Sequence, residues 1–369
     1  MNNNEEKLLC CMNCFTDPVL REFIKNAEAI DNCSFCGSEN IHCIAPNELQ
    51  EIFEPLIRLY SPIENFMPME ELKEREGDFL WEKLQDDWEL FTEEVSEKKE
   101  DLLTSISKPS DPKDESKRQY ISSFVEMPSK YWGIHDNFSE TMVQYWDKFC
   151  HELIFNNRYF PQIDFELELI SDLISFMTRK IKKGNILYRA RISSENIKID
   201  PVNMGKPPSH RSQSGRANPK GIPYLYLGSN RKTVIAEARP LILDCITIGK
   251  FKVIESLDII DLINPSIESP FRLKNDLEYL LMYLEFLRKL GEELSKTINP
   301  QVADLQYVPL QYLCEFIKNK GYDGVAYKSS LTKGYNLAIY SDQKVKCIST
   351  ERHKVHNIKY TSKNINADS

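Results

Sequence analysis

A single carboxylate, Glu237, lies in an otherwise apolar segment and is the first candidate for chemistry. The surrounding residues read TVIAEARP, which is typical of a short helix that Pro240 ends. Because its neighbours are valine, isoleucine and alanine, Glu237 does not resemble a casual surface charge. A carboxylate in such surroundings can stabilise positive charge that develops during a reaction.

The residues just before this helix supply a loop and a strand. Arg216 and Asn218 lie in a glycine-flanked loop, and residues 222–229, which include Tyr226, have β-branched and aromatic strand character. A guanidinium group matches phosphate oxygens in two-bond geometry. The turn at Asn218 can present backbone N–H groups to a phosphate, although the same residues also make an ordinary loop. The segment therefore suggests nucleotide chemistry.

Two other segments carry polar residues that such a site needs. Residues 186–191 read ILYRAR, a strand in which Arg189 and Arg191 point to the same face, so both can reach a ligand. Downstream, the sequence YDGVAYKSSLTKGYNLAIY contains Ser329 and Asn336, which by themselves are ordinary turn residues. A structural alternative is a buried ion pair between Arg189 and the helix carboxylate, holding sheet to helix.

Taken in order, the three segments resemble the RES domain family over residues 184–342. That family is named for an arginine, a glutamate and a serine, which here correspond to Arg189, Glu237 and Ser329, while Tyr226 matches the aromatic residue of its LY strand. The resemblance implies an ADP-ribosyltransferase-like fold and an enzyme that consumes NAD. Small members of the family are toxins, so it also implies an inhibitory antitoxin or another regulatory protein as a partner.

The resemblance further implies a role for each matched residue. Cleavage of the bond between nicotinamide and ribose passes through a state that is positive at the sugar, which Glu237 would stabilise. The other matched residues would bind the pyrophosphate or position the rings, riboses and amide of the substrate. They are Arg189, Arg191, Arg216, Asn218, Tyr226, Ser329 and Asn336. Water, inorganic phosphate and a macromolecule all remain open as acceptors. The alternatives are an ADP-ribosyltransferase acting on a macromolecule and a noncatalytic zinc-containing nucleotide sensor.

Six of the ten cysteines precede residue 44, and four of these form two CxxC pairs. Cys11 and Cys14 are separated from Cys33 and Cys36 by 18 residues, a spacing that is typical of a four-thiolate zinc site. Four sulfur ligands leave no position for water, so this zinc would be structural. Replacement of one ligand by one of three neighbours, Cys10, His42 or Cys43, and a disulfide framework remain alternatives.

The composition limits the class of protein. Hydrophobic residues make up 41% and charged residues 28%, and the sequence has no apolar run long enough to span a membrane. The amino terminus lacks the features of a signal peptide, so a cytoplasmic location is expected. A net charge of -9 argues against a broad nucleic-acid-binding surface. No motif specifies an oligomeric state, and a homo-oligomer is the expectation.

We expect four parts: a zinc ribbon at 1–45, an all-α domain at 46–165, a RES domain at 166–360 and a flexible tail at 361–369. The all-α part resembles the HEPN-like domain that precedes some RES domains. It lacks the spacing of arginine and histidine that active HEPN ribonucleases carry, so ribonuclease activity is not expected. Its periodicity predicts helices at 48–59, 70–95 and 140–155, and the charged stretch at 93–118 predicts a loop or a frayed helix that interrupts them.

The carboxyl-terminal half alternates strands and helices, which indicates the α+β class. The predicted strands are 186–191, 222–229, 245–254, 324–327 and 336–340, and the predicted helices are 229–238, 277–295 and 310–320.

Overall fold

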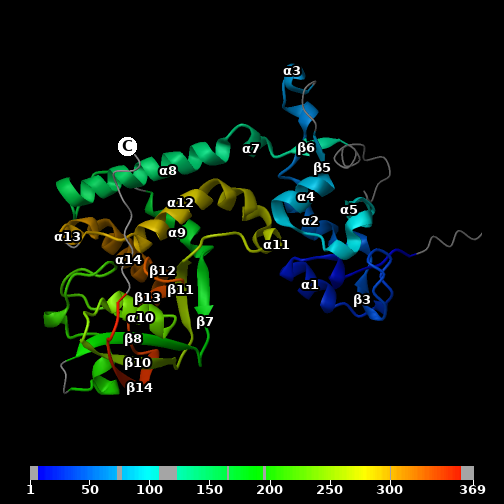
Figure 1. Cartoon of the computed structure of the whole chain (residues 1–369). Coiled ribbons are helices and arrows are strands. Elements are labelled where there is room, and N and C mark those ends of the chain that lie inside the picture. The colour runs from blue at the N-terminus through cyan, green and yellow to red at the C-terminus, as the bar shows by residue number, and fades with distance from the viewer. Residues whose placement is uncertain are drawn as a thin grey trace, which may run out of the picture. The chain divides into compact units, whose positions relative to one another are not determined.

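The computed structural model describes residues 7–72, 77–107, 123–163, 166–193, 197–299 and 301–358. The chain divides into two compact units (Figure 1). Unit 1 comprises Met1–Phe138 and Ser266–Tyr283, and unit 2 comprises Ser139–Pro265 and Leu284–Ser369. None of the helices in the described part of the chain has the length and apolar character that crossing a bilayer requires.

Unit 1 begins with a small antiparallel sheet in the order β1-β3-β2, formed by Cys10–Cys11, Ile41–Ile44 and Ile30–Asp31. Helix α1 (Pro18–Lys25) follows the first cysteine pair. It starts where the sequence indicates, because the Asp17 side chain accepts hydrogen bonds from the first backbone N–H groups and proline occupies the first turn.

One hydrophobic core joins the cysteine-rich segment to the helices of unit 1. Helices α2 (Gln50–Ile57), α4 (Leu80–Trp88) and α5 (Lys99–Ser107) contribute to it. Helix α11 (Pro270–Leu273) reaches the same core from much later in the sequence. Its Phe271 packs on Phe53 with ring centroids 4.8 Å apart.

The prediction that residues 46–165 are all helical is wrong. A second small sheet, in the order β4-β6-β5, pairs Ser61–Pro62 and Asp78–Phe79 with Phe124–Glu126. These strands of two or three residues are too short for any periodicity to indicate them. Helix α3 (Met69–Leu72) and α4 are separate helices rather than one at 70–95, and Gly77 and β5 lie between them.

Residues 93–118 were predicted as a loop or a frayed helix, and they are helical where the structure describes them. A 3₁₀ helix at Glu93–Lys98 leads into α5, whose Leu102, Leu103 and Ile106 are buried. Burial of these apolar side chains stabilises the helix in spite of the charged composition of the segment. Residues 108–118 lie outside the described residues, as does the predicted tail at 361–369.

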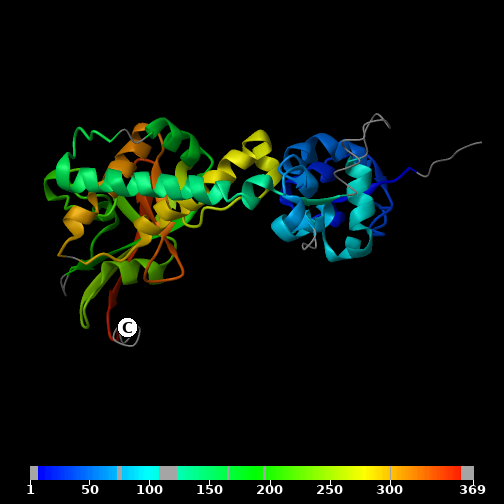
Figure 2. The ribbon, with the colours of Figure 1, turned by 90° about the horizontal axis from the view of Figure 1, so that it is seen from above.

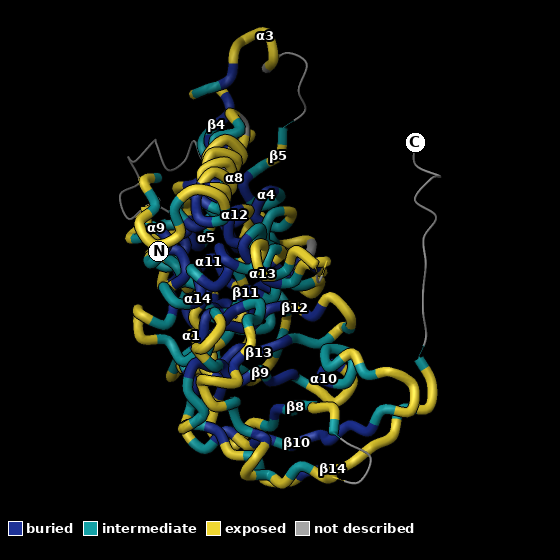
Figure 3. The backbone as a smooth tube through the Cα atoms, turned by 90° about the vertical axis from the view of Figure 1, so that its left-hand side faces the viewer, coloured by how far each residue is buried: buried dark blue, intermediate teal, exposed yellow. Residues whose placement is uncertain are grey.

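Unit 2 is built on an eight-stranded sheet in the order β14-β10-β8-β9-β13-β12-β11-β7. Only β11 and β12 pair in parallel. In chain order the strands are β7 (Thr178–Ile181), β8 (Ile186–Ser193), β9 (Leu225–Gly228), β10 (Cys245–Val253), β11 (Leu257–Leu262), β12 (Gly324–Lys328), β13 (Tyr335–Ile339) and β14 (Val345–Lys354). The strands in the middle are buried and β14, at one edge, is largely exposed (Figure 3).

The sheet is narrowest between β8 and β9, which share a single residue pair, Tyr188 with Gly228. Glycine is required there because a Cβ atom on Gly228 would lie 2.6 Å from a methyl group of Val234 in the next helix. The sheet therefore consists of two multi-stranded parts that meet at one point.

Several helices pack around this sheet. They include α9 (Leu167–Ser175), α10 (Arg231–Ala238), α13 (Ala303–Gln306) and α14 (Val308–Asn319). Helices α8 (Ile134–His151) and α12 (Leu277–Ser295) begin in unit 1 and end in unit 2. The carboxyl-terminal part of α8 lies beside α14, where the rings of Phe149 and Tyr312 are 5.2 Å apart (Figure 2).

Five of the eight strands of unit 2 and its helices α10, α12 and α14 correspond to predicted elements, whereas strands β7, β11 and β14 were not predicted. Helix α12 has the predicted bounds, and α10 begins after Asn230, whose side chain accepts from the N–H of Thr233. The α+β class is therefore correct, whereas an ADP-ribosyltransferase-like core stays a prediction. The compact units differ from the predicted domains in two ways: the cysteine segment shares the core of the helices, and residues 266–283 belong to unit 1.

Candidate active site

A cavity of about 470 Å³ lies in unit 2 at the point where the sheet narrows. Strands β8 and β9 contribute Arg189 and Tyr226 to its wall. The other predicted site residues on the wall are Arg216, Glu237 and Asn336. The fold thus brings together five polar residues that are spread over almost 150 positions of the sequence.

Glu237 belongs to the last turn of α10 and is held by two hydrogen bonds. Its Oε1 atom accepts from Ser329 Oγ at 2.8 Å and from Asn336 Nδ2 at 2.7 Å. Among the described residues, neither bond involves Oε2 and no other donor to that atom is found. The carboxylate is therefore fixed in orientation on one oxygen and has capacity left on the other.

Ser329 and Asn336 come from the two ends of the β12–β13 connection. Asn336 pairs with Tyr327 in the ladder and lines the cavity. Ser329 is buried, does not line the cavity and contacts it only through the carboxylate. The structure thus places Ser329 behind Glu237, where it holds the carboxylate.

The two arginines of β8 have different surroundings. Arg189 donates to the carbonyls of Met204 and Gly205 at 3.2 and 2.7 Å, and burial lowers its pKa to about 10. Arg191 is exposed, lies outside the cavity wall and donates to the Asn203 carbonyl at 2.8 Å. The sequence left both arginines as ligand candidates, and the structure brings only Arg189 to the cavity.

The alternative of a buried ion pair between Arg189 and Glu237 does not describe the structure. No ion pair joins these side chains in the part of the chain that is described, since each is bonded to other groups. The arginine and the carboxylate therefore both remain available on the cavity wall.

Arg216 connects the cavity wall to the end of α12. Its guanidinium donates to the carbonyl of Leu294 and, at 2.7 Å, to that of Lys296. The same group lies over the rings of Tyr307 and Tyr327, with its central carbon 5.7 and 5.9 Å from their centroids. The guanidinium is therefore next to two aromatic rings. An anionic group can compete with the backbone carbonyls for its hydrogen bonds.

Asn218 organises the loop that precedes β9 and does not line the cavity. Its amide donates to the carbonyls of Gln213, Pro219 and Ile222, and its oxygen accepts from the Tyr226 hydroxyl at 2.7 Å. A side chain at Gly215 is excluded, because a Cβ atom there would lie 2.5 Å from the Asn218 oxygen. The position of Asn218 therefore favours a role in holding Tyr226 over direct contact with a ligand.

The Tyr226 hydroxyl is committed to this loop. It donates to Asn218 and accepts from the N–H of Ala217 at 3.1 Å. Burial raises the pKa of Tyr226 well above its ordinary value, so the hydroxyl stays neutral. What Tyr226 offers the cavity is therefore its ring.

Sequence reasoning missed the less polar side of the cavity. Ile298, Ala303 and Tyr307 come from the segment after α12, and Tyr327 comes from β12. Arg239, which follows α10 in the segment TVIAEARP, also lines the cavity and was not predicted as a site residue. The register of Tyr327 with Asn336 is a signal that could have found Tyr327. No motif marks Ile298, Ala303 and Tyr307.

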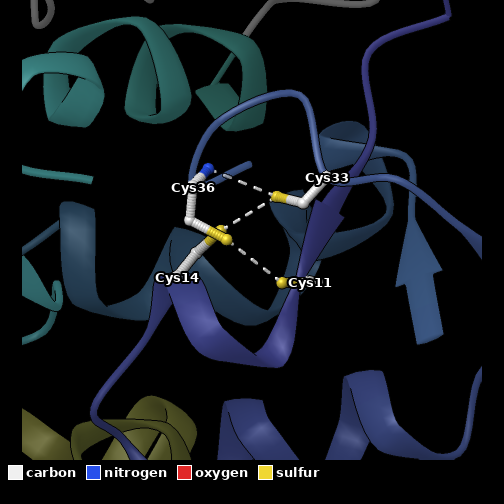
Figure 4. A group of neighbouring side chains, drawn as sticks. All are labelled: Cys11, Cys14, Cys33 and Cys36. Atoms are coloured by element: carbon white, nitrogen blue, oxygen red, sulfur yellow. Dashed lines mark hydrogen bonds between the residues drawn. The ribbon is translucent and has the colours of Figure 1, made fainter. Parts of the chain in front are cut away.

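The four cysteines of unit 1 form a second candidate site. The sulfur atoms of Cys11, Cys14, Cys33 and Cys36 all lie within 4.8 Å of one another (Figure 4). Tetrahedral Zn–S bonds of about 2.3 Å place sulfur atoms roughly 3.8 Å apart, so this donor set fits a zinc ion. Cys11 ends β1 and Cys14 ends the 3₁₀ helix that follows, whereas the second pair lies in the turn after β2.

The alternative ligands point to other groups. His42 Nδ1 lies 2.7 Å from the carbonyl oxygen of Ala27, and Cys43 Sγ donates to the Asp31 carbonyl. Cys10 is fully buried, and burial raises the pKa of its thiol well above the ordinary value. The predicted set of four is therefore the one that the fold assembles.

Two family models match the chain, one in each half. Residues 186–361 match the family model described as the RES domain, and residues 26–164 match that described as HEPN/RES N-terminal domain 1. A solved structure described as the crystal structure of the M. tuberculosis MbcT-MbcA toxin-antitoxin complex aligns with 51% of this chain and 93% of that chain. Its TM-score of 0.31 at 14% identity is too low to support any conclusion. No curated protein matches the chain.

Proposed function

Because the chain carries a RES domain behind a HEPN/RES N-terminal domain, we propose that it is an enzyme that breaks the nicotinamide–ribose bond of NAD. The observation that carries this proposal is Glu237 itself. One of its oxygens is held by Ser329 and Asn336 on the wall of a cavity that also presents Arg189 and Arg216. A fixed carboxylate on a wall that also carries arginine side chains suits a substrate that has both a developing positive charge and a pyrophosphate.

The bond between ribose C1′ and the nicotinamide nitrogen breaks with its electron pair going to nicotinamide. The ring was cationic and leaves as a neutral molecule, so no general acid is needed. The sugar becomes oxocarbenium-like, and Glu237 stabilises this positive charge by electrostatics and by hydrogen bonds to the ribose hydroxyls. An acceptor then adds to C1′, and when the acceptor is water it loses a proton to solvent.

The arginines bind the pyrophosphate by exchanging partners. Arg189 and Arg216 now donate to backbone carbonyls, and phosphate oxygens are stronger acceptors for a guanidinium fork. Burial of Arg189 strengthens its interaction with an anion because less water screens it. Asn336 and the ring of Tyr226 contact the substrate, while Asn218 and Ser329 position other site residues.

The remaining parts of the proposal concern metal and partners. The four cysteines hold a structural zinc ion, which supplies folding energy and no chemistry. NAD loss harms a cell, so the enzyme acts as a toxin or defence effector and an inhibitory antitoxin controls it. In the leading form of the proposal the acceptor is water or inorganic phosphate, so the enzyme is a glycohydrolase or a phosphorylase. Transfer of ADP-ribose to a macromolecule shares the same bond cleavage.

The proposal is tested by incubating the purified protein with NAD and measuring free nicotinamide by chromatography. We expect Glu237→Gln to lower the rate of release by at least about 100-fold, the typical effect of losing one preorganised electrostatic group. Glu255→Gln, on an exposed residue outside the cavity, is the matched control and should keep full activity.

The mass of the ribosyl product distinguishes water, phosphate and a protein as the acceptor. Equal release by wild type and Glu237→Gln would show that this carboxylate is not catalytic. NAD binding without release, with or without phosphate and cell extract, would favour a nucleotide sensor instead.

A further inference from the structure

Unit 2 contains a second cavity, of about 740 Å³, which shares no lining residue with the candidate active site. It lies between the end of α12 and the connection from β12 to β13. Four lysines line it: Lys289, Lys296, Lys328 and Lys333. We call this space the lysine cavity.

The charge of the lysine cavity is positive although the chain carries a net charge of -9. Two glutamates, Glu292 and Glu293, accompany the four lysines, which leaves two positive charges in excess. Glu293 is shared by Lys289 and Lys296, with N–O distances of 3.1 and 4.0 Å. Such half-exposed pairs are weak and yield readily to a competing anion.

The other two lysines stand on the connection between the strands. Lys328 and Lys333 are exposed, and within the described residues neither makes an ion pair or hydrogen bond through its ammonium group. The hydroxyls of Thr297 and Ser330 line the same cavity and are further donors. The cavity thus combines ammonium groups and hydroxyls, the donors that phosphate oxygens accept.

One feature opposes an anion here, because the end of α12 directs backbone carbonyls toward this region. The carboxyl-terminal end of a helix carries partial negative charge. Arg216, however, donates to the carbonyls of Leu294 and Lys296. This cation offsets the negative end of the helix.

We propose that the lysine cavity binds a polyphosphate-bearing small molecule. Leu331 is the one apolar side chain among its lining residues, and none is aromatic, so the wall offers no stacking surface for a base. Recognition is therefore through the phosphates. The volume is ample for a pyrophosphate group together with a sugar.

Two contacts link this cavity to the candidate active site. Ser329 lines it and donates to Glu237, and Lys296 lines it while its carbonyl accepts from Arg216. A bound polyphosphate is thus next to the residues that hold a catalytic carboxylate and a substrate-binding arginine. This link rests on the proposed function, whereas binding itself does not.

The test is isothermal titration calorimetry with inorganic pyrophosphate and, separately, with ADP. The protein is the full chain carrying Arg189→Gln, which weakens anion binding in the candidate active site. Adding Lys328→Gln and Lys333→Gln should weaken pyrophosphate binding by at least about tenfold, since each removes a charge-assisted contact. Lys346→Gln, on an exposed lysine of β14, is the matched control and should leave the affinity unchanged.

Equal affinity for ADP and pyrophosphate is expected if only phosphates are recognised. Absence of binding, or binding that the two lysine substitutions leave intact, would overturn the proposal. Because calorimetry needs no turnover, these outcomes are independent of whether nicotinamide is released from NAD.

Discussion

The cysteine cluster and the active-site cavity are both built from residues that the sequence marks, but they are assembled differently. The four cysteines lie within residues 11–36, and two tight turns bring their sulfur atoms together. The cavity draws on residues from 189 to 336 and depends on the register of strands far apart in the chain. A local site can be specified by spacing alone. The distributed site forms only when the sheet has brought its separate segments together.

The largest effect is expected for the cysteine cluster, which is the more local of the two sites. Cys14→Ala should abolish stoichiometric zinc binding and unfold the cysteine segment, because a structural zinc site contributes about 10–16 kcal/mol of apparent folding free energy. Cys10→Ala, which removes a buried thiol outside the cluster, should retain one zinc per chain. Zinc content by mass spectrometry and hydrogen exchange of residues 7–44 measure both. Retention of zinc by Cys14→Ala would contradict the four-thiolate site.

A smaller effect is expected for a residue that acts through another. Ser329→Ala removes one of the two hydrogen bonds to Glu237 and should lower kcat for nicotinamide release about tenfold, with KM little changed. A merely structural role would lower stability and leave kcat per folded molecule intact, so thermal unfolding is measured alongside. Ser349→Ala, on exposed β14, is the control.

A difference in the KM for NAD should separate the two arginines of β8. Arg189→Gln should raise the KM for NAD about tenfold or more, since it removes a cation from the cavity wall. Arg191→Gln should change it by less than about twofold, because Arg191 is exposed and lies off that wall. Steady-state kinetics on the two variants measure the contrast. Equal KM values for both would mean that the strand presents its arginines differently when substrate binds.

The elements of unit 2 that could be predicted are those with clear boundaries, whereas strands β7, β11 and β14 were missed. Helix α12 has 19 residues with amphipathic spacing, and α10 has an asparagine cap and ends two residues before a proline. That Glu237 lines the cavity was predictable in part, because a lone carboxylate among apolar neighbours is unusual. The roles of Asn218 and Ser329 were not predictable, because both residues contact side chains that only the tertiary structure brings near.

In unit 1 the sequence was less informative. The sheet formed by β4, β5 and β6 consists of short strands held by pairing rather than by pattern. Helix α5 lies within the charged stretch that was predicted as a loop or a frayed helix, and its leucines are buried in the core. The cysteine spacing, by contrast, identified the correct four residues because CxxC turns are local.

The packing of Ser266–Tyr283 in unit 1 has a consequence for synthesis of the protein. Phe271 and Leu277 fill the core of that unit, yet the ribosome makes them only after strands β7 to β11 of unit 2. The amino-terminal unit therefore cannot complete its core in the order in which a nascent chain usually folds its domains. We infer that the cysteine cluster, complete by residue 36, is the part of this unit that can form early while the rest awaits residues translated much later.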